Sequence, residues 1–361
     1  MSTTNLQRLQ QVRDALPKWQ VEGLLVSNPV NCRWLSGFSG SFSFLLVTAD
    51  KALLATDSRY WIQAAEQAPD FELFQSQRTM ADMARFVNAT DAAVIGFEAD
   101  CVTYKQGLEL QTLEGISWRP LNQTLEPLRM QKSAEEIALI QAAAAITDAA
   151  MTQMSDFLVP GMAEAELAWR LESRMRELGA DGMAFPPIVA FGSNSALPHH
   201  APGERKLQEG DIVLVDMGAR LKGYHSDLTR TFYYGKKADP KFLEIFDIVL
   251  AAHTAAMAKI KAGVNTRETH LAAADVIAEA GYGEHFGHGL GHGLGLEIHE
   301  IPFLSATREP QIVVNHSTVT VEPGIYIEGC GGVRIEDLIL VTPDGCQAIS
   351  HCPKKPNLIT P

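Results

Sequence analysis

Two acidic residues fall on the facing strands of a predicted β-hairpin in the second half of the chain. The apolar run Asp211-Ile-Val-Leu-Val-Asp216 ends in a carboxylate, and the strand expected over 224–232 carries Asp227. If the turn is the two-residue Leu221-Lys222, residue 216 faces residue 227. Directly opposed residues share one face of a hairpin, with Cβ atoms about 5 Å apart. The pattern therefore predicts two carboxylates side by side.

A second hairpin near the C-terminus predicts another such pair. One strand is expected over 318–322 and another over 333–340, and the three-residue turn 328–330 places Glu322 opposite Glu336. Pro323 and Gly324 make this ladder irregular. Four neighbouring carboxylates cannot all stay ionised without a cation between them, so the two hairpins together indicate a cation site. The alternative is that each acid is a surface-facing strand residue.

Histidines follow in a glycine-rich segment between the two hairpins. The segment 286–300 holds His288, His292 and His299, with five glycines between positions 287 and 295. Imidazole is a common ligand of zinc, cobalt and manganese. The segment is not the HExxH helix of zinc proteases, and the chain has no GKS or GKT phosphate-binding sequence. A further pair, His199-His200, lies in a turn-rich stretch that, on sequence alone, indicates a solvent-exposed loop.

The elements around these residues predict an α/β fold in two domains. In the first third, strands are expected over 23–26, 43–47, 52–55, 71–74, 92–96 and 116–118, and helices over 58–67, 79–88 and 103–112. The boundary is placed after Pro127, where Ser133 and Glu136 form a capping box ahead of a helix, so the domains are 1–130 and 131–361. Long helices are expected over 134–157, 163–178, 240–261 and 266–280.

Composition excludes several classes of protein. The 361 residues carry a net charge of −13, with 46% hydrophobic and 20% charged residues, so the chain is neither disordered nor a coiled coil. An acidic surface disfavours nucleic acid and anionic membranes as partners. Five cysteines without a CxxC pair are typical of a reducing cytosol, and neither a signal peptide nor an apolar run long enough to span a membrane is evident. A cytoplasmic protein is expected.

The acidic and histidine motifs, taken in order, resemble those of the metallopeptidases that include aminopeptidase P, prolidase and methionine aminopeptidase. The segments that carry the resemblance are Val215-Asp216-Met-Gly, Ser226-Asp227-Leu-Thr-Arg-Thr, Gly291-His292-Gly-Leu-Gly-Leu, Thr320-Val-Glu322-Pro-Gly and Arg334-Ile-Glu336-Asp. Upstream, the segments 31–41 and 56–60 resemble a creatinase-type N-terminal domain. The resemblance implies a creatinase-like domain followed by a "pita-bread" catalytic domain with pseudo-twofold symmetry.

The resemblance also implies a set of site residues. Two divalent metal ions (manganese, cobalt or zinc) would be held by Asp216, Asp227, His292, Glu322 and Glu336, with Asp227 and Glu336 as the bridging carboxylates. The catalytic residues implied are Glu322, which would accept and shuttle a proton, and His199 and His299, which would stabilise the tetrahedral intermediate. The residues expected around the substrate are His199, His299, Tyr326 and Arg334. His288 matches a variable position and receives no role. Relatives are dimers or tetramers, which implies a homodimer or higher homo-oligomer.

The implied activity is hydrolysis of the Xaa-Pro bond at the N-terminus of small peptides with proline in second position. The main prediction is an Xaa-Pro aminopeptidase, and the nearest alternative is an Xaa-Pro dipeptidase (prolidase) restricted to dipeptides. Methionine aminopeptidase is disfavoured by the additional N-terminal domain, and creatinase, which uses no metal, by the intact ligand set. An alternative from another class is a catalytically inactive relative that binds peptides or proteins.

Overall fold

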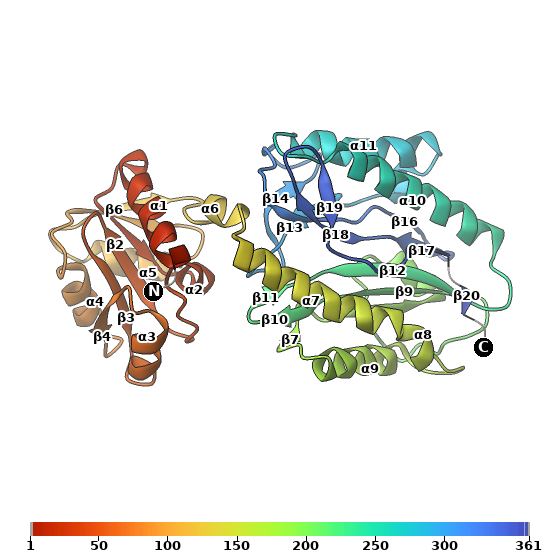
Figure 1. Ribbon diagram of the computed structural model, residues 1–361, viewed down its shortest axis with the longest axis horizontal. Coiled ribbons are helices and arrows are strands. Elements are labelled where there is room, and N and C mark those ends of the chain that lie inside the picture. The colour runs from red at the N-terminus through yellow and green to blue at the C-terminus, as the bar shows by residue number, and fades with distance from the viewer. Residues whose placement is uncertain (1–2, 357, 360–361) are drawn as a thin grey trace. The chain divides into compact units, whose positions relative to one another are not determined.

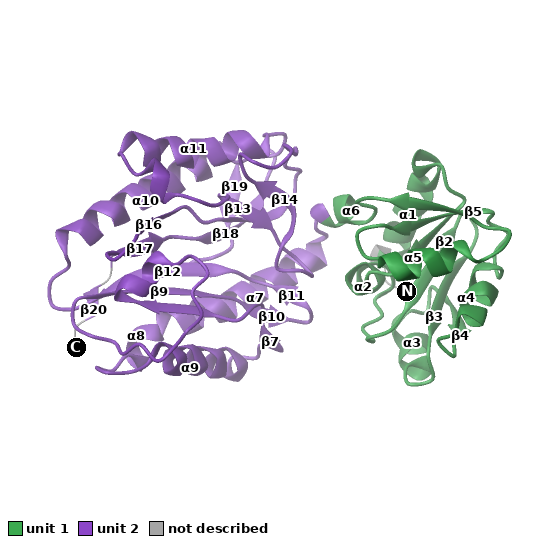
Figure 2. Ribbon diagram, turned by 180° about the vertical axis from the view of Figure 1, so that it is seen from behind, with its two compact units in different colours: residues 1–129 green, residues 130–361 purple. Residues whose placement is uncertain are grey.

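The computed structural model describes residues 3–356 and 358–359 and divides the chain into two compact units, residues 1–129 and 130–361 (Figure 2). Both units combine strands and helices, as the sequence predicted. Among the helices of the described chain, none is both long enough and apolar enough to cross a membrane.

The first unit is built on one six-stranded sheet with the order β4-β3-β2-β1-β5-β6 (Figure 1). Only β2 runs antiparallel to its neighbours. The strands are β1 (Gly23–Val26), β2 (Phe44–Thr48), β3 (Ala52–Thr56), β4 (Glu72–Gln75), β5 (Val94–Glu98) and β6 (Ser117–Leu121). Each strand predicted in this region is present, with its ends displaced by a few residues at most.

Six helices accompany this sheet. They are α1 (Thr3–Trp19), α2 (Pro29–Ser36), α3 (Trp61–Gln67), α4 (Met80–Val87), α5 (Tyr104–Gln111) and α6 (Glu126–Met130). The sequence analysis did not predict α2. Its start is set by Asn28, whose side chain accepts hydrogen bonds from the backbone N–H groups of Val30 and Asn31, and by Pro29 in the first turn.

The second unit has longer helices and several small sheets. Its helices are α7 (Ala134–Thr152), α8 (Met154–Phe157), α9 (Glu164–Glu177), α10 (Pro240–Lys259) and α11 (Thr266–Glu279), with the short 3₁₀ helices η1 (Gly192–Ala196) and η2 (Gly283–His285). Its strands are β7 (Gly182–Met183), β8 (Ile188–Phe191), β9 (Asp211–Met217), β10 (Ala219–Leu221), β11 (Tyr224–His225), β12 (Leu228–Tyr234), β13 (Gly291–Gly293), β14 (Glu300–Leu304), β15 (Thr318–Val321), β16 (Gly324–Ile327), β17 (Gly331–Arg334), β18 (Asp337–Val341), β19 (Cys346–Ala348) and β20 (Leu358–Ile359). The predicted helices are all present, and Ser133 forms the predicted capping box with Glu136.

Two apolar cores flank the strands of this unit. In one core, Leu167 and Leu171 of α9 pack with Val213 and Val215 of β9. In the other, α10 and α11 pack over β15–β18, with Phe246 as one of the fully buried side chains. Figure 1 shows α7–α9 on one side of the strands and α10 and α11 on the other. The strands that carry the acidic motifs therefore lie between two helical layers.

The first hairpin corrects the predicted register. Asp216 faces Thr229, not Asp227, because the turn is Lys222-Gly223 instead of Leu221-Lys222. Both turn residues have positive φ, 48° for Lys222 and 83° for Gly223, as a two-residue type I′ turn requires. Glycine adopts a positive φ without strain. The predicted turn would instead have required a positive φ at Leu221, whose side chain disfavours it. The partner of residue 216 moves by two positions, so Asp227 keeps its predicted face of the sheet.

The second hairpin has the predicted register. Strands β16 and β17 pair Gly324 with Arg334 and Ile327 with Gly331, which leaves 328–330 as the three-residue turn. Beyond a break, β15 and β18 continue in the same register, with Val321 opposite Asp337. Positions 322 and 336 therefore fall opposite each other inside the break. The single strand predicted over 333–340 is wrong in this respect, because it is interrupted at residues 335 and 336.

Candidate metal centre

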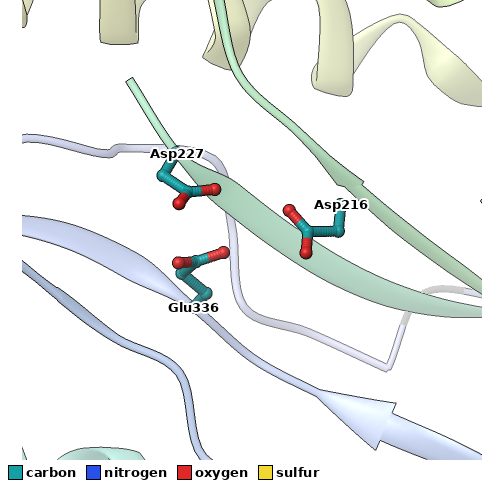
Figure 3. Close-up of side chains that lie close together, drawn as sticks. All are labelled: Asp216, Asp227 and Glu336. Carbon is teal, nitrogen blue, oxygen red and sulfur yellow. The ribbon is translucent and has the colours of Figure 1, made fainter. Parts of the chain in front are cut away.

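Three carboxylates from distant parts of the chain converge between the helical layers. Asp216, Asp227 and Glu336 each offer an oxygen atom, and the three atoms lie within 4.8 Å of one another. Figure 3 shows their carboxylates gathered around one small space. Asp216 ends the apolar part of β9, Asp227 immediately precedes β12, and Glu336 lies between β17 and β18. The two hairpins therefore deliver acids to one point, as predicted.

Asp227 and Glu336 lie at interruptions of the hairpins, whereas Asp216 lies within the continuous strand β9. In the first hairpin the ladder breaks between β9 and β10 and again between β11 and β12, at the residue pair Ser226 and Asp227. In the second it breaks at Glu322 and Glu336, where the flanking ladders share one register. At such a break the backbone leaves the regular pleat, so the side chain can be aimed independently of its neighbours.

His292 and Glu322 border the same cluster. The Nε2 atom of His292 lies 3.6 Å from Oδ2 of Asp227 and 3.5 Å from Oε1 of Glu322. Its Nδ1 atom lies 3.0 Å from the carbonyl oxygen of Gly293. A proton on Nδ1 satisfies that contact and leaves the lone pair of Nε2 directed at the carboxylates. The structure thus brings together all five residues predicted as ligands.

The carboxylates of this cluster have too little positive charge nearby to keep all of them ionised. Burial raises the pKa of Asp227 well above the ordinary value, and the neighbouring carboxylates raise it further. The same two causes raise the pKa of Glu336. Burial likewise raises the pKa of Glu322 to about 8. Burial lowers the pKa of His292 to about 3, so the ring is neutral near pH 7, the form that coordinates metals.

The donor set fits a divalent cation. Two buried atoms, Oδ1 of Asp216 and Oδ1 of Asp227, have no hydrogen-bond partner among the described residues. A buried oxygen without a partner costs free energy, and a bound ion would satisfy both atoms. Several carboxylates with one imidazole suit manganese, cobalt or zinc, so these residues could hold such ions.

A hydrogen-bonded network backs the carboxylates. Nη2 of Arg334 lies 2.6 Å from Oδ2 of Asp216, and its Nη1 donates to the hydroxyl oxygen of Tyr326 at 2.9 Å. Thr229 accepts from Nε of Arg334 at 3.0 Å and donates to Oε2 of Glu336 at 2.8 Å. Sequence reasoning missed Thr229 because the wrong turn placed it away from Asp216.

The remaining histidines lie around this network. The ring of His299 stands edge-on to that of His292, with centroids 4.4 Å apart, while His199 is exposed on the loop after η1. Burial lowers the pKa of His299, and the nearby charge of His199 lowers it further. His288 contacts the hydroxyl of Tyr326 through Nε2 at 2.9 Å. His288, to which the sequence analysis assigned no role, is therefore connected through Tyr326 to the network of Arg334.

The loop that carries His199 is fixed by an acid that the sequence analysis did not single out. Glu164, at the start of α9, is fully buried and accepts hydrogen bonds from the backbone N–H of Phe191 and of Gly203, at 2.8 and 3.1 Å. It also contacts Nε2 of His200 at 2.8 Å. These partners bracket the loop on both sides. No local pattern could reveal Glu164, because its partners lie 27 to 39 positions away.

A second cluster of buried charged residues contacts the backbone of Glu336. Nη2 of Arg230 lies 2.7 Å from Oδ1 of Asp337, and Nη1 of Arg230 donates to the backbone carbonyl of Glu336. Lys354 near the C-terminus also pairs with Asp337. The backbone at Glu336 is therefore held by a buried ion pair.

Comparison with known proteins places both halves of the chain. The family model described as metallopeptidase family M24 matches residues 138–343, and that of the creatinase/prolidase N-terminal domain matches residues 8–131. An Xaa-Pro dipeptidase of Pyrococcus horikoshii is 33% identical over 95% of this chain and 97% of its own length.

Solved structures agree over nearly the whole length. An Xaa-Pro dipeptidase from Bacillus anthracis has a TM-score of 0.95 at 38% identity, covering 98% of this chain and 99% of its own. An X-Pro aminopeptidase from Thermotoga maritima has a TM-score of 0.88 at 33% identity, covering 96% and 99%. These matches confirm the resemblance and the predicted fold class, a creatinase-type N-terminal domain followed by a pita-bread domain.

Proposed function

The chain belongs to metallopeptidase family M24, and from that membership we propose that it is a metal-dependent Xaa-Pro dipeptidase. The observation that carries the proposal is the convergence of Asp216, Asp227 and Glu336 on one buried point beside His292 and Glu322. The sequence analysis ranked an aminopeptidase first. The relatives named as dipeptidases, one of them with a TM-score of 0.95, reverse that order.

The proposed ligand set is the predicted one, with two divalent ions. Asp227 and Glu336 would bridge the ions, Asp216 would chelate one of them, and His292 and Glu322 would complete the other site. When bound, such ions supply a hydroxide at neutral pH and polarise the scissile carbonyl. Manganese, cobalt and zinc all suit this donor set. Elemental analysis of the purified protein tests both the number and the identity.

Glu322 is the proposed proton acceptor. Burial raises the pKa of its carboxyl to about 8, against the opposing effect of the nearby charge of Arg334. A carboxyl whose pKa lies near neutrality can take a proton and return it to the leaving amine. Thr320 donates to Oε1 of Glu322 at 3.2 Å, which orients that side chain toward His292.

Four further residues are proposed to hold the substrate. His199 and His299 would contact the scissile group, and the neutral ring of His299 can donate to a developing oxyanion. Tyr326 and Arg334 would order the opposite side of the site through their mutual hydrogen bond. The bond before proline lacks an N–H, so recognition has to use the ring and the flanking polar groups instead of that donor.

Peptide length decides between the two activities. We expect the metal-loaded protein to hydrolyse Ala-Pro and Gly-Pro but to leave the matched tripeptide Ala-Pro-Ala intact. Asp227→Asn should lose metal and turnover together, whereas Asp344→Asn, at an exposed loop position, should retain both. Metal-loaded protein that hydrolyses neither peptide would refute the proposal and favour an inactive peptide-binding relative.

An Xaa-Pro aminopeptidase is the second candidate, favoured by the similarity to the Thermotoga maritima enzyme. Release of alanine from Ala-Pro-Ala at a rate comparable to that from Ala-Pro would establish this activity instead. A homodimer or higher homo-oligomer is also proposed from the family resemblance, and light scattering of the purified protein tests it.

A further inference from the structure

A pocket of about 590 Å³ opens within the first unit, separate from the residues of the metal centre. Its floor is formed by Leu25 of β1, Phe44 of β2 and Ala55 of β3, and its walls by side chains of α4 and α5. The volume lies within the range of pockets that take small molecules. The size alone thus permits an organic ligand and excludes a folded partner.

The pocket lies where the topology of the sheet favours ligand binding. Strands β1, β4 and β5 point the same way, so the residues that follow them, Ser27, Ser76 and Cys101, lie at one edge, and all three line the pocket. The chain crosses from the outer strand β4 through α4 to β5 on the other side of β1. Crevices outside the carboxyl ends of strands at such a crossing are the usual ligand sites of open α/β sheets.

The lining is aromatic and aliphatic, with one cation at its rim. Besides Phe44, the pocket contacts Phe42, Phe74 and Phe86, together with Met83 of α4. These side chains provide a surface for an apolar body, and methionine adapts to its shape. Among the described residues that line the pocket, the cationic side chain is that of Arg78, and the two acids, Asp82 and Glu109, lie within ion-pair distance of Arg85 and Lys105. A ligand group that pairs with Arg78 would therefore be negative.

The guanidinium of Arg78 is placed to pair with a negatively charged group of a ligand. Arg78 lies in the bend before α4 with a φ of 65°, and its guanidinium lies 4.3 Å from the centre of the Phe42 ring. Its nearest charged neighbour is Asp57, at 3.7 Å, but that carboxylate already makes a two-point contact with Arg59 at 2.8 Å. The acid Asp82 on the pocket wall is likewise engaged, by Arg85. Arg78 thus retains donors for a ligand carboxylate.

We propose that this pocket binds a small carboxylic acid with an aromatic or aliphatic body, whose carboxylate pairs with Arg78. The apolar body would lie on Phe44 and against Met83, and the carboxylate would remain at the rim. The inference does not depend on the activity of the metal centre, because it uses only residues of the first unit.

Isothermal titration of the full-length protein with 4-phenylbutyrate tests the proposal. We expect saturable binding of one molecule per chain, and binding of the neutral 4-phenyl-1-butanol at least about tenfold weaker, since a charged hydrogen bond is lost. Arg78→Gln should weaken phenylbutyrate binding by a similar factor, whereas Arg78→Lys should retain most of it. Lys18→Gln, a control at an exposed cation of α1 that does not line the pocket, should leave it unchanged.

A second variant separates the pocket from nonspecific adsorption. Met83→Trp fills the cavity from its wall and should abolish binding while the circular dichroism spectrum and the hydrolysis of Ala-Pro stay at wild-type levels. Absence of saturable binding at millimolar phenylbutyrate would overturn the proposal. Equal binding by wild type, Arg78→Gln and Met83→Trp would overturn it as well.

Discussion

Metal binding to the carboxylate cluster should release protons, and the number released should depend on Glu322. Burial holds the pKa of this side chain at about 8 in the metal-free fold, so near pH 6.5 it carries a proton. A cation binds only the deprotonated form. Stripping the protein with a chelator and titrating a divalent metal back at several pH values therefore measures the predicted proton directly.

The expected magnitude follows from linkage. Well below pH 8, each proton displaced on binding lowers Kd about tenfold per unit rise in pH. Because Glu322 is half ionised at pH 8, it alone should tighten metal binding about 50-fold between pH 6 and pH 8. Asp227 and Glu336 also have raised pKa values and should make the dependence steeper. Above pH 8 the contribution of Glu322 should level off.

The same group has a consequence for the stability of the metal-free protein. The pKa of Glu322 is raised on folding from 4.5 to about 8, so its favourable contribution is complete below pH 4.5 and is lost as the pH rises through 8. At about 1.4 kcal/mol per unit the shift corresponds to at most about 5 kcal/mol, and less where water reaches the side chain, which is 19% exposed. Metal-free protein should therefore melt at a lower temperature at pH 8 than at pH 5.

Calorimetry in buffers of different ionisation enthalpy counts the protons. The slope of the observed enthalpy against the buffer enthalpy gives the number released, and Glu322→Gln should reduce it by about one near pH 6.5. Glu172→Gln on the surface of α9 is the matched control and should change nothing. A Kd that is independent of pH between 6 and 8, or an unchanged proton count in Glu322→Gln, would refute the assignment of a protonated, ligand-forming Glu322.

Three other variants test the residues that support the site. Asp337→Asn leaves the buried guanidinium of Arg230 without its ion pair and should cost about 3–5 kcal/mol in denaturant unfolding; a loss below about 1 kcal/mol would contradict the pairing. Thr229→Val should weaken metal binding about 10–100-fold by calorimetry, with Thr229→Ser restoring it, and an unchanged Kd in the valine variant would count against this role. Glu164→Gln should raise the KM for Ala-Pro several-fold with a smaller change in kcat, because the loop of His199 loosens; equal loss in both would indicate a general defect.

Local patterns in the sequence were sufficient to predict most elements of the fold. The capping box at Ser133 and the short apolar runs of the first unit depend on neighbours a few residues apart, so a single sequence contains them. Helix α2 was not predicted, and unlike α4 and α5, which have the same length, it begins without a capping box. The hairpin error had an equally local origin, since Lys222 adopts a positive φ that a non-glycine residue seldom takes.

The convergence of the acids was predictable despite that error, for a geometric reason. Side chains alternate along a strand with a period of two, so a correction of two positions returned Asp227 to the face of Asp216. The roles of the supporting residues do not follow from strand periodicity. Glu164 and Thr229 act through contacts 27 to 107 positions away in the chain, and nothing in their immediate sequence marks them.

The contacts of Arg334 leave the carboxylate cluster able to bind a cation. Its guanidinium pairs with Oδ2 of Asp216 and leaves Oδ1 of the same carboxylate without a partner. One fixed positive charge cannot neutralise Asp216, Asp227, Glu336 and Glu322 together, and raised pKa values remain on the last three. Arg334 therefore orients the carboxylate of Asp216 without taking the place of a cation. An arginine placed at the centre of the cluster would occupy the space between the carboxylates, whereas at its edge Arg334 leaves that space to a divalent cation.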